Sequence, residues 1–241
     1  MRRSLFAITL LFFAVSCASL EDLLEQSTGA RPLTQDEIIR GLKQALEVSA
    51  QNAAGTASVE GGYLNNSDLF IRFPEEAAFV EKQLRDLGFG RLVDDFVTSL
   101  NRSAELAARE AAPIFVNAVR NMTIGDGLEI LQGESNAATL YLRRNTETEL
   151  IQAFTPVITS KLNETAATRY WSDLIGTYNR IPLVRQVNPD LVAYATENAM
   201  DGLFLLVERE EAEIRRDPAK RVTDLLRRVF GSPEAGESEA R

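Results

Sequence analysis

Apolar residues recur every three or four positions along most of the chain, the spacing that places them on one face of an α-helix. The first clear stripe begins after Thr34, which together with Glu37 has the sequence pattern of a capping box. Similar stripes continue as far as Gly231, with Pro113 and Pro156 as the expected points of interruption. The pattern predicts an all-α (mainly α) fold, a single irregular helical bundle over residues 34–231.

One segment departs from the helical spacing. Residues 61–68 are rich in glycine and asparagine, which favour turns. Residues 69–73 combine aromatic and β-branched side chains in a short run that Pro74 closes. These features predict a strand at residues 69–73 and, at most, one short β-hairpin near residues 61–73.

Three further expectations concern the second half of the chain. Ser135 is expected to cap the helix that begins after it, because a serine hydroxyl can accept a hydrogen bond from a free backbone N–H group. The run of acidic and basic residues at 208–216 is interpreted as the solvated face of a helix. Asp217 and Pro218 are expected to open a last helix that ends at Gly231, and residues 232–241 are predicted to be a disordered tail.

The first residues follow a different pattern. Two arginines precede an apolar run that ends at Val15, which is the layout of a secretory signal peptide and too short to cross a bilayer. Residues 14–17 resemble the lipobox of bacterial lipoproteins, in which the cysteine becomes the lipid-bearing N-terminus. We expect removal of residues 1–16, a lipid attached to Cys17, and a spacer up to residue 33. Ordinary cleavage after Ala18, which would discard the cysteine, is the alternative.

The cysteine count supports lipidation. Cys17 is the only cysteine, so the chain cannot form an intramolecular disulfide, and a free thiol would be a liability in an oxidising compartment. No aspartate follows the cysteine, which in such lipoproteins points to the outer membrane. The expected location is therefore the cell envelope, as an outer-membrane lipoprotein that faces the periplasm, or otherwise the periplasm itself.

The charge balance narrows the possible partners. Removal of residues 1–16 takes away two of the 26 basic residues and none of the 35 acidic ones, so the net charge changes from −9 to −11. Such a surface repels phosphates, which excludes nucleic acid as an expected partner. It is also repelled by anionic headgroups, so the lipid on Cys17 is expected to make the membrane contact.

The composition removes most kinds of catalytic site. The chain has no histidine, and its one cysteine lies at the processing site, so Ser-His-Asp, Cys-His and Cys/His zinc sites are excluded. Gly88 and Gly90 begin a dinucleotide-binding pattern, but the third glycine and the preceding strand are missing. We therefore expect no nucleotide, no cofactor and no metal, and no enzymatic activity.

Carboxylate chemistry is the remaining catalytic option. The best cluster contains Asp94, Asp95, Asn101, Arg102, Glu105 and Glu110. Asn101 and Glu105 share a helix face at a spacing of four residues, and the preferred interpretation is a polar face with a buried contact made by Arg102 and Glu105 or by Asn101. Asp126 and Asp201 are isolated acids, interpreted as helix caps or network partners. Asn101, Arg102, Glu105, Asp126 and Asp201 are the speculative binding residues.

Six stretches along the chain together resemble one family. They are Ile39–Leu46, Gly62–Asn66, Leu100–Glu105, Ala137–Tyr141, Asp201–Phe204 and Glu210–Pro218. In order and content they are similar to the bacterial family known as domain of unknown function 4197, over nearly all of residues 34–231. The resemblance implies an exported, mostly helical protein of about one domain, and it implies no catalytic or binding residues.

Three functions are compatible with these observations. The first is a lipid-anchored cell-envelope protein whose helical body binds a protein partner. The alternative is an envelope protein whose bundle encloses an apolar ligand such as a lipid, suggested by the 12 phenylalanines and the alanine-rich stretch at residues 104–112. A carboxylate-based enzyme centred on Asn101, Arg102 and Glu105 is the third.

Overall fold

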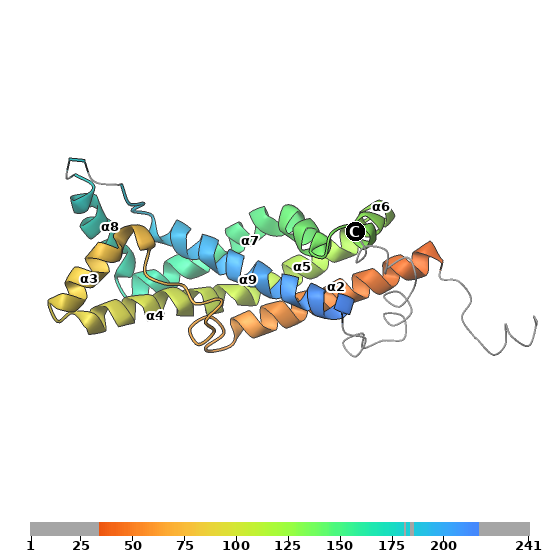
Figure 1. Ribbon diagram of the computed structural model, residues 1–241, viewed down its shortest axis with the longest axis horizontal. Coiled ribbons are helices and arrows are strands. Elements are labelled where there is room, and N and C mark those ends of the chain that lie inside the picture. The colour runs from red at the N-terminus through yellow and green to blue at the C-terminus, as the bar shows by residue number, and fades with distance from the viewer. Residues whose placement is uncertain (1–33, 181, 184–185, 217–241) are drawn as a thin grey trace, which may run out of the picture. The chain divides into compact units, whose positions relative to one another are not determined.

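The computed structural model describes residues 34–180, 182–183 and 186–216, which form a helical bundle (Figure 1). The described part contains α-helices and short 3-10 turns but no strand. The predicted mainly α single domain is therefore confirmed. The predicted signal peptide, Cys17, the spacer, the helix after Asp217 and the tail all lie outside the described residues.

The elements follow one another with few long connections. In chain order they are α2 (Gln35–Ser58), η1 (Glu75–Ala77), α3 (Ala78–Asp86), α4 (Gly90–Ala107), η2 (Ala108–Glu110), α5 (Ala111–Asn121), α6 (Ile124–Gln132), α7 (Ala137–Glu164), α8 (Ala167–Tyr178) and α9 (Leu191–Arg216).

The core lies where α2, α4, α5, α7 and α9 meet. Helix α9 contacts α2, α4 and α7, and in Figure 1 it runs beside α7 along much of that helix. Leu42, Leu100, Phe115, Phe154 and Phe204 are almost completely buried between these helices. Their burial supplies the main favourable term for folding.

The alanine-rich stretch is a close helix contact. Ala104, Ala107, Ala108 and Ala111 are fully buried, and α2 packs against the η2 turn that contains one of them. Small side chains let the helix backbones approach each other. The turn at η2 comes just before Pro113, so the predicted break in the helix at this proline is confirmed, whereas α7 continues through Pro156.

Two helices begin with capping boxes. At α2 the hydroxyl of Thr34 accepts a hydrogen bond from the backbone N–H of Glu37, whose carboxylate accepts one from the backbone N–H of Thr34. This confirms the prediction. Thr123 and Asp126 make the same reciprocal pair at the start of α6. The predicted cap at Ser135 is wrong, because α7 begins after Asn136 and its N–H groups bind a side chain of another helix, Glu211.

The predicted strand at residues 69–73 and the hairpin near residues 61–73 are also wrong. Residues 60–65 and 67–69 form turns, and residues 70–72 have no regular structure. The backbone of Ile71 does find a partner, but it is the side-chain amide of Asn101. The side chain of Asn101 therefore forms the backbone hydrogen bonds that a neighbouring strand would otherwise form, and the segment has no sheet partner in the described part of the chain.

The charged end of α9 is only partly solvated, so the interpretation of residues 208–216 as a solvated face is wrong for two residues. Glu208 and Arg209 are exposed, but Glu211 is 5% exposed and the side chain of Arg215 is 12% exposed. Glu211 lies four residues after Val207 and three before Ile214, which are both buried. It therefore falls on the apolar face of the helix, where a carboxylate needs hydrogen-bond partners.

Candidate functional site

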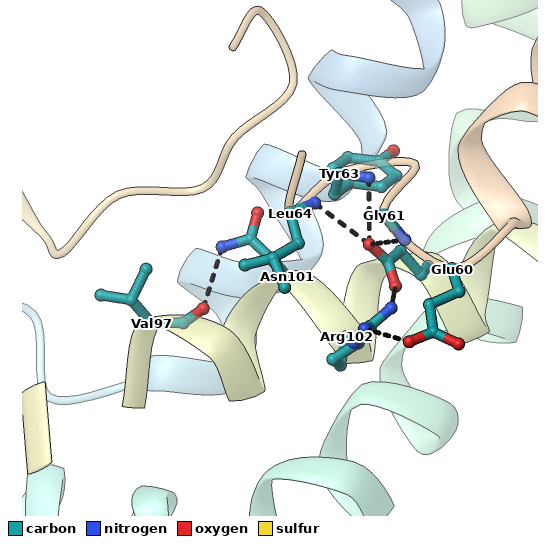
Figure 2. A network of polar contacts seen from close by, with 8 residues as sticks. Glu60, Gly61, Tyr63, Leu64, Val97, Asn101 and Arg102 are labelled. Atoms are coloured by element: carbon teal, nitrogen blue, oxygen red, sulfur yellow. Dashed lines mark hydrogen bonds and ion pairs between the residues drawn. The ribbon is translucent and has the colours of Figure 1, made fainter. Parts of the chain in front are cut away.

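Glu105 of α4 holds the loop that follows α2 (Figure 2). Its Oε1 atom accepts hydrogen bonds from the backbone N–H groups of Gly61 (3.0 Å), Tyr63 (3.2 Å) and Leu64 (3.0 Å). The side chain is almost completely buried. Three backbone donors at one oxygen compensate much of the cost of taking the charge out of water.

Arg102 completes the network from the preceding turn of α4. Its Nη1 atom donates to Oε2 of Glu105 at 2.6 Å, and its Nη2 atom donates to Oε1 of Glu60 at 2.6 Å. Figure 2 shows the guanidinium between the loop and the helix. The hydrogen bond with Glu105 is the main cause that raises the pKa of Arg102 above its usual value. The arginine therefore balances the buried carboxylate of Glu105 and connects Glu60, at the start of the loop, to α4.

Asn101 fixes the same loop farther along. Its Oδ1 atom accepts from the backbone N–H of Ile71 at 2.8 Å, and its Nδ2 group donates to the carbonyls of Ile71 (2.8 Å) and Val97 (2.9 Å). The side chain is fully buried, and Figure 2 shows the bond to Val97. Both donors and the acceptor of the amide are in use, as a buried asparagine requires.

Tyr63 connects the loop to α9. Its ring is fully buried, and its hydroxyl donates to the backbone carbonyl of Ala199. Burial raises the pKa of this phenol, with smaller contributions from the charges of Asp201 and Glu105. The ring lies against Gly202, where a Cβ atom would come within 2.8 Å of the Cε1 atom of Tyr63.

Three of the stretches that carry the family resemblance meet in this network, namely Gly62–Asn66, Leu100–Glu105 and Asp201–Phe204. At Gly62 a Cβ atom would lie only 2.4 Å from the carbonyl oxygen of Ala57, so the loop must have glycine there. Hydrogen bonds within the protein occupy the polar side-chain atoms of Asn101, Arg102 and Glu105. Their geometry supports the preferred interpretation of a buried structural contact, here one that clamps the loop to the bundle.

A second network, which was not predicted from the sequence, surrounds Glu211. Its two carboxylate oxygens accept hydrogen bonds from the backbone N–H groups of Ala138 (3.1 Å) and Thr139 (2.9 Å), and from the Thr139 hydroxyl (2.8 Å). Arg215 donates to the same carboxylate at 2.8 Å and to the carbonyl of Ile130 at 3.1 Å. Glu211 thus caps α7, and with Arg215 it joins α6, α7 and α9.

The remaining candidate acids lie apart from Asn101 and Glu105. Asp94 pairs with Arg85 at 2.9 Å, Asp95 lies 3.9 Å from Arg91, and Glu110 is exposed. Asp126 is the helical member of the capping box that Thr123 begins at α6, and the hydrogen bond from the backbone N–H of Thr123 is the main cause that lowers its pKa. Asp201 forms an ion pair with Arg143 at 2.8 Å. The two isolated acids are a cap and a network partner, as interpreted.

An open apolar pocket of about 310 Å³ lies between α4 and α8. We call it the aromatic pocket. Its principal lining residues are Phe73, Leu92, Phe96, Tyr170, Trp171 and Leu174. The ring centroids of Phe73, Phe96 and Trp171 lie 5.1 to 5.6 Å from one another, and Phe96 stacks on Trp171 at an interplanar angle of 22°. These packed rings form an apolar wall of the pocket.

The rim of the aromatic pocket exposes large apolar side chains to solvent. Leu92 is 55% exposed, Tyr170 is 66% exposed and Leu174 is 40% exposed. Leu87 and Phe89, in the turn between α3 and α4 that precedes Leu92, are exposed as well. Three separate segments build this surface, so no single stripe in the sequence could reveal it.

One protein family is similar to this chain. The family model described as "Protein of unknown function (DUF4197)" matches residues 32–231. Searches of curated proteins and of solved structures found no match. Within the described residues, no helix is long and apolar enough to cross a membrane, and no group of three or more His, Cys, Asp or Glu side chains could hold a metal ion. Because the family match covers most of the chain, this protein belongs to the DUF4197 family.

Proposed function

We propose that this protein is a lipid-anchored protein of the bacterial cell envelope whose helical body binds another envelope protein at the aromatic pocket. In this proposal the body has no enzymatic activity and takes no cofactor. The lipobox-like sequence at Cys17 supports the anchor, and the lack of an aspartate after it supports the outer membrane facing the periplasm. The net charge of −11 after processing supports attachment through the lipid rather than through the body.

The aromatic pocket carries the proposal. Exposed apolar surface that surrounds a concave apolar site is typical of protein interaction sites. The pocket has walls of packed aromatic rings, and its rim residues Leu92 and Tyr170 are more than half exposed. A partner that inserts an apolar side chain into the pocket would cover this rim at the same time.

An apolar ligand such as an acyl chain is the second candidate for the same pocket. Its volume of about 310 Å³ lies at the small end of the range for small-molecule sites, which usually enclose most of the ligand. A protein partner accounts better for Leu87 and Phe89, which are exposed near the pocket but do not line it. The alanine-rich stretch supports no enclosed cavity, because its alanines are packed against other helices.

Site-specific photocrosslinking in living cells tests the proposal. A photoreactive amino acid replaces the exposed Tyr170 in the full-length protein, and a control protein carries it at Leu140, which is 54% exposed on α7. We expect a discrete protein adduct from position 170, none of the same mass from position 140, and loss of the adduct when Leu92→Asp is added. The same adduct from both positions would contradict the proposal. A mass increase equal to a lipid would favour the second candidate instead.

A further inference from the structure

The turn between α3 and α4 carries an exposed apolar projection beside the aromatic pocket. Leu87 is 69% exposed and Phe89 is 53% exposed, and neither side chain lines the pocket. Figure 1 shows this turn at the same end of the bundle as α8, which forms one wall of the pocket. The same region of the molecule therefore has both an apolar pocket and an apolar projection.

The two helices that form the pocket share one sequence pattern of charged and apolar residues. It reads Arg-Leu-x-x-Asp-Phe at residues 91–96 of α4 and Arg-Tyr-x-x-Asp-Leu at residues 169–174 of α8. In both helices these apolar residues line the pocket and the charged residues are exposed. Arg91 and Asp95 lie 3.9 Å apart, with side chains that are 95% and 70% exposed, so their own ion pair contributes little to stability. These charges are available to a binding partner.

The arrangement of these four charges favours a second copy of this chain as the occupant of the surface. The whole chain has a net charge of −9, but the pattern places two arginines and two aspartates beside the pocket. If α4 lies antiparallel against α8 of a second copy, Arg91 comes opposite the second copy's Asp173. Asp95 then comes opposite the second copy's Arg169. A two-fold axis repeats both pairs, so the surface is complementary to itself in charge.

We propose that two copies of this chain form a two-fold symmetric dimer through this surface. Phe89 of each copy enters the aromatic pocket of the other, and α4 of each copy lies antiparallel against α8 of the other. The inserted ring covers the exposed Leu92 and Tyr170 and adds to the aromatic rings around Trp171, as a buried aromatic anchor does in an interface. The inference rests on the proposed role of the aromatic pocket as an interaction site, and it names the occupant of that site when no other protein is bound.

Sedimentation velocity of the full-length protein over a series of concentrations tests the dimer. The protein carries Cys17→Ser, so that neither a lipid nor a disulfide between chains can hold two copies together. We expect a reversible dimer with a Kd on the order of 1 μM. Phe89→Asp should weaken dimerisation at least about tenfold, and the control Leu140→Asp, at a residue that is 54% exposed on α7, should change the Kd by less than about twofold. A protein that remains monomeric at about 100 μM, or equal effects of the two substitutions, would overturn the proposal.

An exchange of charges tests the pairing of α4 with α8. Arg91→Asp with Asp95→Arg places like charges opposite each other in the dimer and should weaken dimerisation about tenfold. Adding Arg169→Asp with Asp173→Arg restores opposite charges and should return the Kd to within about threefold of its original value. Such a rescue also shows that the exchanged α4 still folds. Failure of the second exchange to restore the dimer would overturn the proposed pairing.

The crosslinking experiment at Tyr170 separates this inference from the proposed function. A protein that sediments as a monomer but still gives an adduct with another protein would overturn the dimer and support the proposed function. A protein that sediments as a dimer, and whose one adduct has twice the mass of the chain, would support the dimer and contradict binding of another protein.

Discussion

Replacing Glu105 with alanine should destabilise the folded domain strongly, because this carboxylate holds the loop after α2 against α4. The change removes the acceptor for three backbone N–H groups, those of Gly61, Tyr63 and Leu64, all within 3.2 Å. It also leaves Arg102, whose side chain is 28% exposed, with Glu60 as its remaining carboxylate partner. The buried donors and the arginine would then have to be satisfied by water or by movement of the loop.

The expected loss follows from the burial of this pair. Hydrogen bonds to a charged group contribute about 1.5–3 kcal/mol each, but such contributions are not additive within one network. Removal of one partner from a buried ion pair typically costs about 3–5 kcal/mol. In a domain of this size each kcal/mol lowers Tm by about 2–4 °C, so Glu105→Ala should lower Tm by about 6–20 °C. Glu105→Gln keeps one acceptor oxygen and should lose less.

Thermal and urea unfolding of the full-length protein measure this effect, with circular dichroism at a helix-sensitive wavelength as the signal. Glu110→Ala is the matched control, since Glu110 is an exposed acid just after the same helix. We expect a change of at most about 0.5 kcal/mol in the control. If Glu105→Ala melted at the same temperature as the control, the clamp would be refuted. An unchanged Tm with a lost cellular phenotype would point to a binding or catalytic site at Glu105.

Further predictions concern α9, Tyr194 and the anchor. Gly202→Ala should destabilise the protein by about 1–2 kcal/mol in urea unfolding, because the new Cβ atom would crowd Tyr63. The control Gly176→Ala, which has open space around the new Cβ atom, should stabilise the protein by up to about 1 kcal/mol. Equal effects of the two substitutions would contradict the close packing at Gly202. Glu211→Ala should cost about 3–5 kcal/mol by the same measurement, since it removes the cap of α7 and the buried ion pair between Glu211 and Arg215. A cost as small as that of the exposed Glu208→Ala would refute the network. Burial, together with the charges of Glu76 and Glu75, raises the pKa of Tyr194 to about 12 in the folded protein, whereas the pKa of an unfolded tyrosine is about 10. The contribution of the neutral phenol to folding stability is therefore fully present below about pH 10 and is lost as the pH rises from about 10 to about 12. Tyr194→Phe should therefore lose less stability than the wild-type protein across that pH range, and parallel losses would contradict the assignment. Cys17→Ser should release the protein from the membrane fraction, and a variant that still sediments wholly with membranes would refute the lipid anchor.

The helical spacing of apolar residues was sufficient to predict the mainly α fold, and Thr34 with Glu37 was sufficient to place the start of α2. Local patterns succeed here because capping and amphipathic burial depend on residues close in sequence. The strand prediction at residues 69–73 failed because a distant side chain, Asn101, satisfies the backbone of Ile71. Composition alone contains no information about such a partner.

The buried polar contacts show the same limit. Arg102 and Glu105 are three residues apart on one helix, so their contact could be predicted, but the loop that they bind comes from far away in the sequence. The charged neighbours of Glu211 in the sequence predict a solvated face, which is wrong for this buried residue. Its position between Val207 and Ile214 on the apolar side of α9 was the signal that could have identified it.

Trp171 offers the most direct test of the proposed interaction surface, because it is the only tryptophan in the chain and it lines the aromatic pocket. The measurement is the fluorescence emission of the full-length protein as the partner identified by crosslinking at Tyr170 is added, with the partner's own emission subtracted. We expect a saturable shift in the emission of Trp171 that Leu92→Asp abolishes and Leu140→Asp leaves intact. Saturable binding of the partner with no change in Trp171 emission would contradict it.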